Sequence, residues 1–279
     1  MFQYAAGRSL SIRNRIGFLV DIRSGFIRDK VFNRKFALEQ FDIKPVKADI
    51  WYSVPFWVRQ TSRKLHAGCL KPITENMWGT FLYEPELRFI EEIARAKVNQ
   101  NAWMDGYWQS ERYFEDLKEL IALELMPPTP EYRVSLFAAE LIQSKEAVAI
   151  GIRLFEDVPG HDKSGAGGLT PFSFYEAAAR QLGKKLSDPT FFLFCTSMPL
   201  IKNKLSLPGP VRYITADNGY SCPMQTLWLL SRFRYHIISN SSFYWWGAWL
   251  AERNDPGATI IASDLFPNQD TIPDRWVRV

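Results

Sequence analysis

The chain has 279 residues, of which 47% are hydrophobic and 23% are charged, a composition that disfavours disorder, collagen and coiled coil. The length predicts about two domains, each able to bury its own core. The 34 basic and 30 acidic residues leave a formal net charge of +4, and the basic residues are scattered along the chain. This charge favours an anionic small ligand and gives no basic stripe for nucleic acid.

Cysteine usage and hydropathy indicate the compartment. The cysteines are Cys69, Cys195 and Cys222, and no CxxC spacing joins any two of them. This pattern argues against a disulfide framework and a structural zinc site, and it favours a reducing compartment. The most apolar stretch, residues 226–239, contains two arginines and a histidine, and residues 1–6 do not resemble a signal peptide. We therefore expect a cytoplasmic chain with no transmembrane anchor.

The first half of the chain has an irregular pattern. Residues 51–71 are aromatic and basic without clear periodicity; within them residues 57–64 suit either an ordinary solvated face or weak peripheral contact with anionic lipid. Ser110 is the expected N-cap of its helix. The expected helices are residues 2–15, 84–97 and 110–125, and the expected strands are residues 17–22 and 102–106.

The second half alternates apolar runs with helical patterns. Such strands belong in a parallel sheet covered on both faces, as in a Rossmann-like domain. Thr170 is the expected N-cap of the first helix, with Pro171 at its first position. The expected strands are residues 147–152, 190–195, 211–215, 236–239 and 258–262, and the expected helices are residues 171–186, 200–205, 223–234 and 241–253.

A proline-rich stretch at residues 126–130 marks the domain boundary, because consecutive prolines end a helix. We assign residues 1–127 to an N-terminal α/β domain and residues 128–279 to a C-terminal Rossmann-like domain. Two α/β domains that face each other predict a ligand cleft between the carboxyl ends of their sheets.

Two segments at the ends of predicted strands suit an anionic ligand. Arg153 closes the first strand of the second half, where its guanidinium can bind a diphosphate; a surface salt bridge fits the position equally. Residues 239–243 read S-N-S-S-F between a strand and a helix, so they can bind an anion, serve only as an N-cap, or do both. The glycine-rich residues 160–168 lack both the dinucleotide and the P-loop order.

Other residues are more ambiguous. No acidic residue follows the strand at 190–195, and no Asp-x-Asp occurs, which disfavours an NAD-type ribose site and a metal clamp on a diphosphate. His236 fits a packed strand position, whereas His161 lies in the glycine-rich segment and is the better functional candidate. The tryptophans at 245, 246 and 249 favour buried core over sugar stacking.

Three segments match, in the same order along the chain, the sequence motifs of one known family. Residues 239–250 read SNSSFYWWGAWL and resemble the family signature SNSSFSWWGAWL. Residues 105–114 match the family segment GYWQSE-x-YF, and residues 1–8 resemble the part that follows the family's GGLGNQ loop. Residues 32–38 give a weaker fourth match. These matches span nearly the whole chain, which therefore resembles glycosyltransferase family 11, the α-1,2-fucosyltransferases of bacteria and animals.

The resemblance implies a GT-B architecture, an α/β fold in which two Rossmann-like domains face each other across a cleft. It also implies that the first strand and glycine-rich loop of the N-terminal domain are missing from this sequence. The family element H-x-R-R-G-D falls on residues 151–156, where only Arg153 is retained. Gln225 and Thr226 stand where related fucosyltransferases carry an acidic residue that recognises guanine.

The activity that the resemblance implies is transfer of L-fucose from GDP-fucose to a galactoside hydroxyl with inversion. It needs neither metal nor cofactor and serves synthesis of bacterial surface glycans such as the O-antigen of lipopolysaccharide, at the inner face of the membrane. We expect catalysis by Arg153 and Glu156, with Asp157 as a neighbouring carboxylate. The expected donor-binding residues are Arg153, Thr226, Asn240, Ser241, Ser242 and Phe243. Two alternatives stay open: a different nucleotide-sugar donor, and a decayed family member without catalysis.

Overall fold

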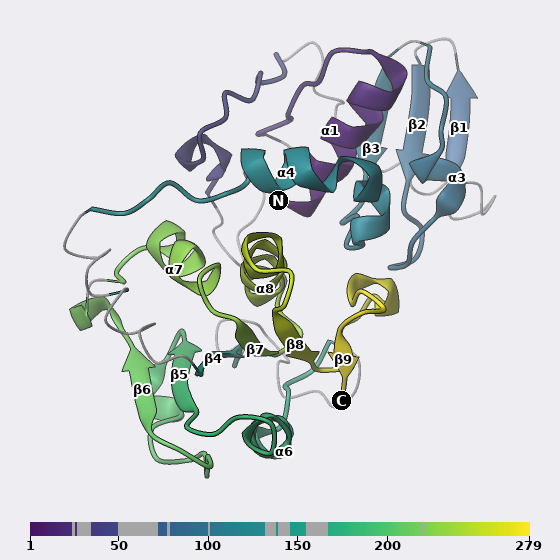
Figure 1. The fold of residues 1–279 in the computed structure, drawn as a ribbon. Coiled ribbons are helices and arrows are strands. Elements are labelled where there is room, and N and C mark those ends of the chain that lie inside the picture. The colour runs from purple at the N-terminus through teal and green to yellow at the C-terminus, as the bar shows by residue number, and fades with distance from the viewer. Residues whose placement is uncertain are drawn as a thin grey trace. The chain divides into compact units, whose positions relative to one another are not determined.

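The computed structural model describes residues 1–23, 26, 35–49, 72–76, 79–99, 101–131, 138, 146–154, 167–218 and 220–279. These residues form two compact units (Figure 1). The N-terminal unit comprises Met1–Leu125 and Asn268–Thr271, and the C-terminal unit comprises Met126–Pro267 and Ile272–Val279. Glu156, Asp157, His161 and the aromatic and basic stretch at 51–71 lie outside the described residues.

The C-terminal unit is built on a six-stranded sheet in which all strands are parallel. Its order is β6-β5-β4-β7-β8-β9, the order of a Rossmann fold, and it reverses direction between β4 and β7. The predicted α/β class with a parallel, Rossmann-like sheet is therefore confirmed. The strands are β4 (Ala147–Ile152), β5 (Thr190–Cys195), β6 (Val211–Ile214), β7 (Tyr235–Ile238), β8 (Thr259–Ala262) and β9 (Val277–Arg278).

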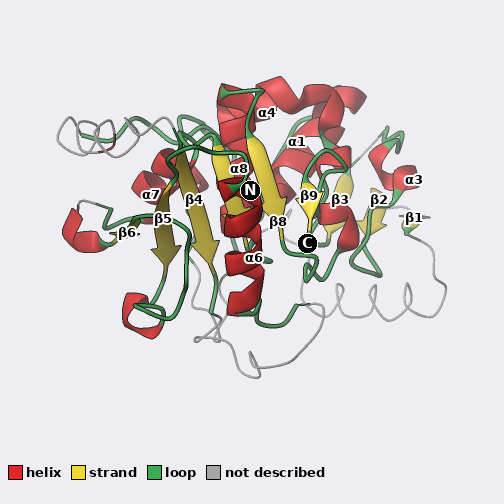
Figure 2. Ribbon diagram, turned by 60° about the horizontal axis from the view of Figure 1, so that its bottom comes forward, coloured by secondary structure: helices red, strands yellow, loops and turns green. Residues whose placement is uncertain are grey.

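Helices cover both faces of this sheet. Helix α6 (Phe172–Gly183) lies on one face, and α7 (Pro223–Leu230) and α8 (Ser242–Asn254) lie on the other (Figure 1). Figure 2 shows α6 in front of the sheet, running roughly along the direction of the strands. The alternation of side chains along β4 explains the two layers. Its residues 148, 150 and 152 join the apolar cluster of α6, whereas the small residues at 149 and 151 leave room for large aromatic side chains on the opposite face.

The aromatic residues of α8 form the core of that second face. Trp245, Trp246 and Trp249 are at most 2% exposed, and the rings of Trp245 and Trp249 are stacked with centroids 6.0 Å apart. The prediction that these tryptophans belong to the core is confirmed. Helix α8 approaches α7 closely, because a Cβ at Gly247 would lie 2.7 Å from Cβ of Leu230. Glycine at this position lets the two backbones pack together.

Several boundaries in this unit differ from the predictions. Helix α6 begins one residue late with Pro171 as its N-cap, so Thr170 is not the cap. The predicted helix at 200–205 is wrong, since a single 3₁₀ turn at Met198–Leu200 occupies that region. Helix α7 ends at Leu230 rather than at 234. Strand β9 was not predicted because it is only two residues long.

The N-terminal unit contains a small three-stranded sheet. Strands β1 (Ile73–Asn76) and β2 (Gly79–Tyr83) pair antiparallel, and β2 pairs in parallel with β3 (Ala102–Asp105). The helices are α1 (Phe2–Asn14), α3 (Glu91–Ala94) and α4 (Lys118–Glu124). The remaining 3₁₀ turns of the described chain are Leu38–Gln40, Glu111–Tyr113, Glu115–Leu117, Ala216–Asn218 and Gln269–Thr271.

Polar contacts hold α1 in this unit. Glu124 accepts hydrogen bonds from Tyr4 Oη at 2.8 Å and from Arg8 Nη2 at 2.9 Å. Ser110 accepts from the N–H of Arg112, as a cap does, although two 3₁₀ turns precede α4 where one continuous helix was predicted. The predicted strand at 17–22 is also wrong, because only Val20 forms a bridge, to Lys47.

Candidate functional site

The sheet of the C-terminal unit brings two of the predicted segments together. Gly151 of β4 pairs with Ile238 of β7. Arg153 and Ser239, the residues that follow these two central strands, therefore lie side by side. The N–H of Ser239 donates to the carbonyl of Gly151 at 3.1 Å, and the N–H of Arg153 donates to Ser239 Oγ at 3.2 Å. This is the point where the strand order reverses, and open parallel sheets bind their ligands at such points.

The turn after β7 ends in the exposed start of α8. Ser241 is the N-cap residue, and its side chain makes no capping hydrogen bond. The N–H groups of the first turn of any helix lack partners within that helix and carry a partial positive charge. Ser242 is exposed, and Ser241 and Phe243 are half-buried. The helix start and the partly exposed Arg153 therefore offer two kinds of positive group at one edge of the sheet, which suits an anion.

The side chain of Asn240 is bonded within the C-terminal unit. It is 6% exposed, and its Nδ2 donates to the carbonyls of Gly168 at 2.8 Å and Leu265 at 3.2 Å. Its Oδ1 accepts from Thr170 Oγ1 at 3.2 Å. Because both ends of the amide are bonded internally, the side chain positions the turn that precedes α8. Thr170, predicted only as a helix cap, joins this buried network and also contacts Ser263 Oγ at 3.4 Å.

We expect Asn240→Ala to destabilise the protein by about 2–4 kcal/mol, because it removes the hydrogen bonds to the carbonyls of Gly168 and Leu265 and to the hydroxyl of Thr170 and opens a gap. Urea unfolding followed by circular dichroism measures the change. Ser242→Ala at the neighbouring exposed position is the control, with an expected change within about 0.5 kcal/mol. Equal midpoints for the two variants would contradict the internal role of Asn240.

Thr226 lies in the first turn of α7, which links the carboxyl end of β6 to the amino end of β7. Its hydroxyl donates to the carbonyl of Cys222 at 3.2 Å, within its own helix. The preceding residue, Gln225, carries a buried Oε1 with no hydrogen-bond partner in the described part of the chain. The side-chain amide of Gln225 can therefore accept a further hydrogen bond, next to Thr226, which was predicted to bind the nucleotide-sugar donor.

His236 is a buried structural residue, as predicted. It is 0% exposed, and its Nε2 lies 3.1 Å from the carbonyl of Phe233. Burial lowers the pKa of His236 to about 4, so the imidazole is neutral at physiological pH.

This lowered pKa predicts a pH-dependent stability. The unfolded chain binds a proton at His236 below about pH 6.5, whereas the folded chain does so only near pH 4. The contribution of the neutral imidazole is complete above pH 6.5 and is lost as the pH falls toward 4, by about 2 kcal/mol between pH 7 and pH 5. Urea unfolding of the parent and of His236→Gln at both pH values tests this. An identical pH dependence in the two proteins would contradict it.

In the part of the chain that the structure describes, no group of three or more His, Cys, Asp or Glu residues is placed to hold a metal ion. Among the same residues, no helix is both long and apolar enough to span a bilayer.

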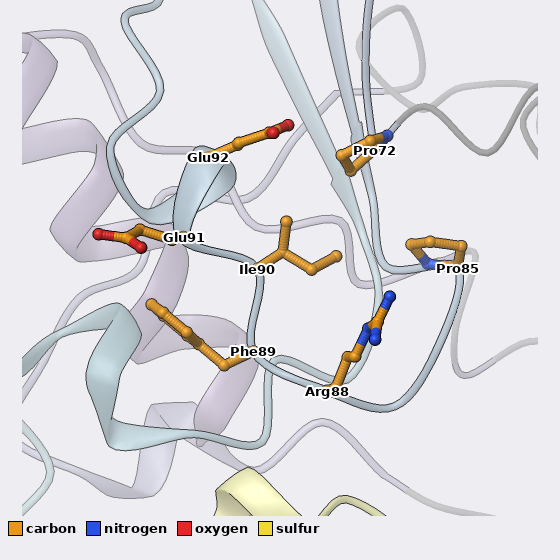
Figure 3. Close-up of a pocket in the computed structure, with 7 residues that line it drawn as sticks. All are labelled: Pro72, Pro85, Arg88, Phe89, Ile90, Glu91 and Glu92. Atoms are coloured by element: carbon orange, nitrogen blue, oxygen red, sulfur yellow. The ribbon is translucent and has the colours of Figure 1, made fainter.

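A separate pocket of about 450 Å³ lies in the N-terminal unit (Figure 3). Pro72, Pro85 and Ile90 give it apolar walls, and Arg88, whose Nε lies 3.1 Å from Glu86, stands at its side. The sequence offered no signal for this pocket. It lacks the combination of a helix start and a strand-end arginine that the edge of the large sheet presents.

The fold defines a Rossmann-type α/β protein, and Arg153 and the start of α8 lie at the edge where its strand order reverses. Residues 90–272 match the model of glycosyl transferase family 11, and the chain belongs to this family. The resemblance inferred from the sequence is thereby confirmed: the protein is a glycosyltransferase, and its family implies a nucleotide-sugar donor and a glycan acceptor.

Two curated relatives from Escherichia coli are similar over most of their length. An alpha-1,2-colitosyltransferase is 28% identical, with 100% of this chain and 94% of the relative covered. The O-antigen biosynthesis glycosyltransferase WbnK is 23% identical, with 90% and 86% covered. Among solved structures, a glycosyl transferase of family 9 from Veillonella parvula DSM 2008 aligns with a TM-score of 0.40 and 10% identity, over 100% of this chain and 82% of that one.

Proposed function

We propose that this protein is an α-1,2-fucosyltransferase that moves L-fucose from GDP-fucose to a galactoside hydroxyl with inversion and without a metal ion. The observation that carries the proposal is that Arg153 lies beside the turn that leads into α8, at the reversal of the strand order. The relatives' names add an α-1,2 linkage and O-antigen synthesis. The proposed setting is therefore bacterial surface glycan assembly, at the inner face of the membrane.

In this mechanism the acceptor hydroxyl attacks the anomeric carbon from the face opposite the diphosphate. The new carbon–oxygen bond forms as the bond to the diphosphate oxygen breaks, and the acceptor proton passes to a base, for which Glu156 is the proposed residue. Negative charge grows on the leaving diphosphate during this step. Arg153 and the N–H groups of residues 242 and 243 stabilise that charge, and preorganised donors of this kind act more strongly on the transition state than on the ground state.

A second candidate is transfer of a colitosyl group by the same site. The relative with 28% identity over the full chain is named a colitosyltransferase, and Gln225 replaces the acidic residue that the sequence comparison led us to expect for guanine. An amide both donates and accepts hydrogen bonds, whereas a carboxylate only accepts. The substitution therefore changes which nucleobase edge the site recognises best.

Thermal unfolding with GDP, UDP or dTDP shows which nucleotide the protein binds, since a ligand at 100 times its Kd stabilises the folded state by about 2.7 kcal/mol. We expect the largest shift with GDP. Transfer to a galactoside is then compared for GDP-fucose and a nucleotide-activated colitosyl donor, with and without a chelator. Fucosyl transfer that persists with chelator supports the first proposal, and colitosyl transfer alone supports the second. Absence of binding to all three nucleotides would indicate a non-catalytic protein.

A further inference from the structure

The peptide group that joins Ile152 to Arg153 is held at both of its polar ends by side chains. Its carbonyl, on Ile152, lies 3.3 Å from the hydroxyl of Tyr244. Its N–H, on Arg153, donates to Ser239 Oγ at 3.2 Å. Ser239 is 0% exposed and Tyr244 is 5% exposed, and both belong to the segment that follows β7. Two buried hydroxyls from one segment thus fix the orientation of a single peptide plane.

The position of the Tyr244 hydroxyl is itself tightly defined. The hydroxyl lies 3.0 Å from the carbonyl of Phe194 as well, so its one proton is shared between the ends of β4 and β5. The ring of Tyr244 lies directly on Gly151, where a Cβ would come within 2.4 Å of the ring carbon Cγ. Glycine at 151 is therefore what allows the tyrosine to reach both carbonyls.

Arg153 lies just beyond the paired part of β4. Pairing of β4 with β7 ends at Gly151, and pairing with β5 ends at Ile152. The orientation of the Ile152–Arg153 peptide therefore depends on its side-chain contacts with Ser239 and Tyr244. A rotation of this peptide would turn the Cα–Cβ bond of Arg153 and displace its guanidinium by more than the tolerance of a catalytic contact.

We propose that Ser239 and Tyr244 are positioning residues that fix the Ile152–Arg153 peptide and thereby direct the Arg153 guanidinium to the leaving diphosphate. This inference rests on the proposed function, in which Arg153 stabilises that group. Both hydroxyls are buried and bonded to main-chain groups, so they act through Arg153 and do not touch the donor. The sequence interpretation missed Tyr244. The signal was present, because Tyr244 stands where the family signature has serine and Gly151 stands where the H-x-R-R-G-D element has histidine.

The test is a double-mutant cycle on the full chain with Tyr244→Phe, Arg153→Ala and the combination of the two. Donor kcat and KM and the GDP Kd by calorimetry are the readouts, and thermal unfolding monitors folding. Tyr244→Phe keeps the ring on Gly151 and removes only the hydroxyl. We expect it to lower kcat by about 10-fold, which is the effect of losing one hydrogen bond that positions a catalytic group. In the Arg153→Ala background we expect it to cause no further loss of GDP affinity or kcat.

Ser239→Ala is the second variant, and Ser231→Ala is its matched control. Ser231 is 1% exposed, and its Oγ donates to the carbonyl of Trp228 at 2.7 Å, in the same unit but after α7. We expect a similar loss of stability from both serine variants and a loss of kcat from Ser239→Ala alone.

If Tyr244→Phe keeps the wild-type kcat while Arg153→Ala loses activity, the positioning role is overturned and the proposed function remains intact. Losses that multiply in the double variant would also overturn it, because they would show that Tyr244 acts independently of Arg153. Wild-type transfer in Arg153→Ala would instead overturn the role of Arg153 in the proposed function.

Discussion

Arg153→Ala is expected to lower glycosyl transfer by roughly 10²–10³-fold, a loss of about 2–4 kcal/mol of transition-state stabilisation. The reason is that the substitution removes a cation from the reversal point of the sheet, where the proposed mechanism places the charge of the leaving diphosphate. The effect should appear in kcat, since a group that acts on developing charge binds the transition state more strongly than the substrate. Steady-state kinetics with the preferred donor measures both constants.

Arg180→Ala is the matched control, because Arg180 is an exposed arginine of the same unit, 3.9 Å from Glu176 on α6. We expect it to transfer at the wild-type rate. Arg153→Lys should recover only part of the loss, since an ammonium keeps the charge but not the planar pair of donors that fits a diphosphate. A kcat of Arg153→Ala equal to that of the control would remove Arg153 from the mechanism.

Gly151→Ala is expected to destabilise the protein by about 1–3 kcal/mol, because the added methyl group would lie 2.4 Å from the ring of Tyr244 in a fully packed layer. The ring cannot retreat without breaking its hydroxyl contacts to the ends of β4 and β5. Chemical unfolding gives the free energy, and we expect a lowered midpoint with an unchanged slope.

Tyr244→Ser is the rescuing change for this clash. Alone it should destabilise the protein, since it leaves a cavity on Gly151. Combined with Gly151→Ala, the loss should be smaller than the sum of the two single losses by about 1–2 kcal/mol, because the methyl group then enters free space. Gly17→Ala is the control, as a Cβ at Gly17 would meet nothing within 4 Å. Additive losses at 151 and 244 would contradict the packing argument.

The parallel sheet was predictable because its strands are short apolar runs that alternate with helical segments, a pattern typical of a parallel sheet covered on both faces. The predicted helix at 84–97 failed for a long-range reason. The N–H of Phe89 donates to Asp270 at 2.9 Å, and the N–H of Ile90 donates to the hydroxyl of Tyr113 at 2.9 Å. Glu84 accepts from the N–H groups of Tyr107 and Trp108. Residues far away in the sequence thus bind two main-chain N–H groups and one carboxylate of this segment. Local helix propensity cannot predict such contacts.

The sequence alone determined the family, the alternation of strands and helices in the second half, the buried tryptophans and the candidate Arg153. Each of these depends on residue type and spacing within one segment or on a family motif. The tertiary structure decided that Asn240 bonds to the carbonyls of Gly168 and Leu265, and that Ser239 and Tyr244 hold the peptide before Arg153. The partners in these contacts are 25 to 92 residues apart, and only parallel strand pairing brings such distant main-chain groups to the same edge of a sheet.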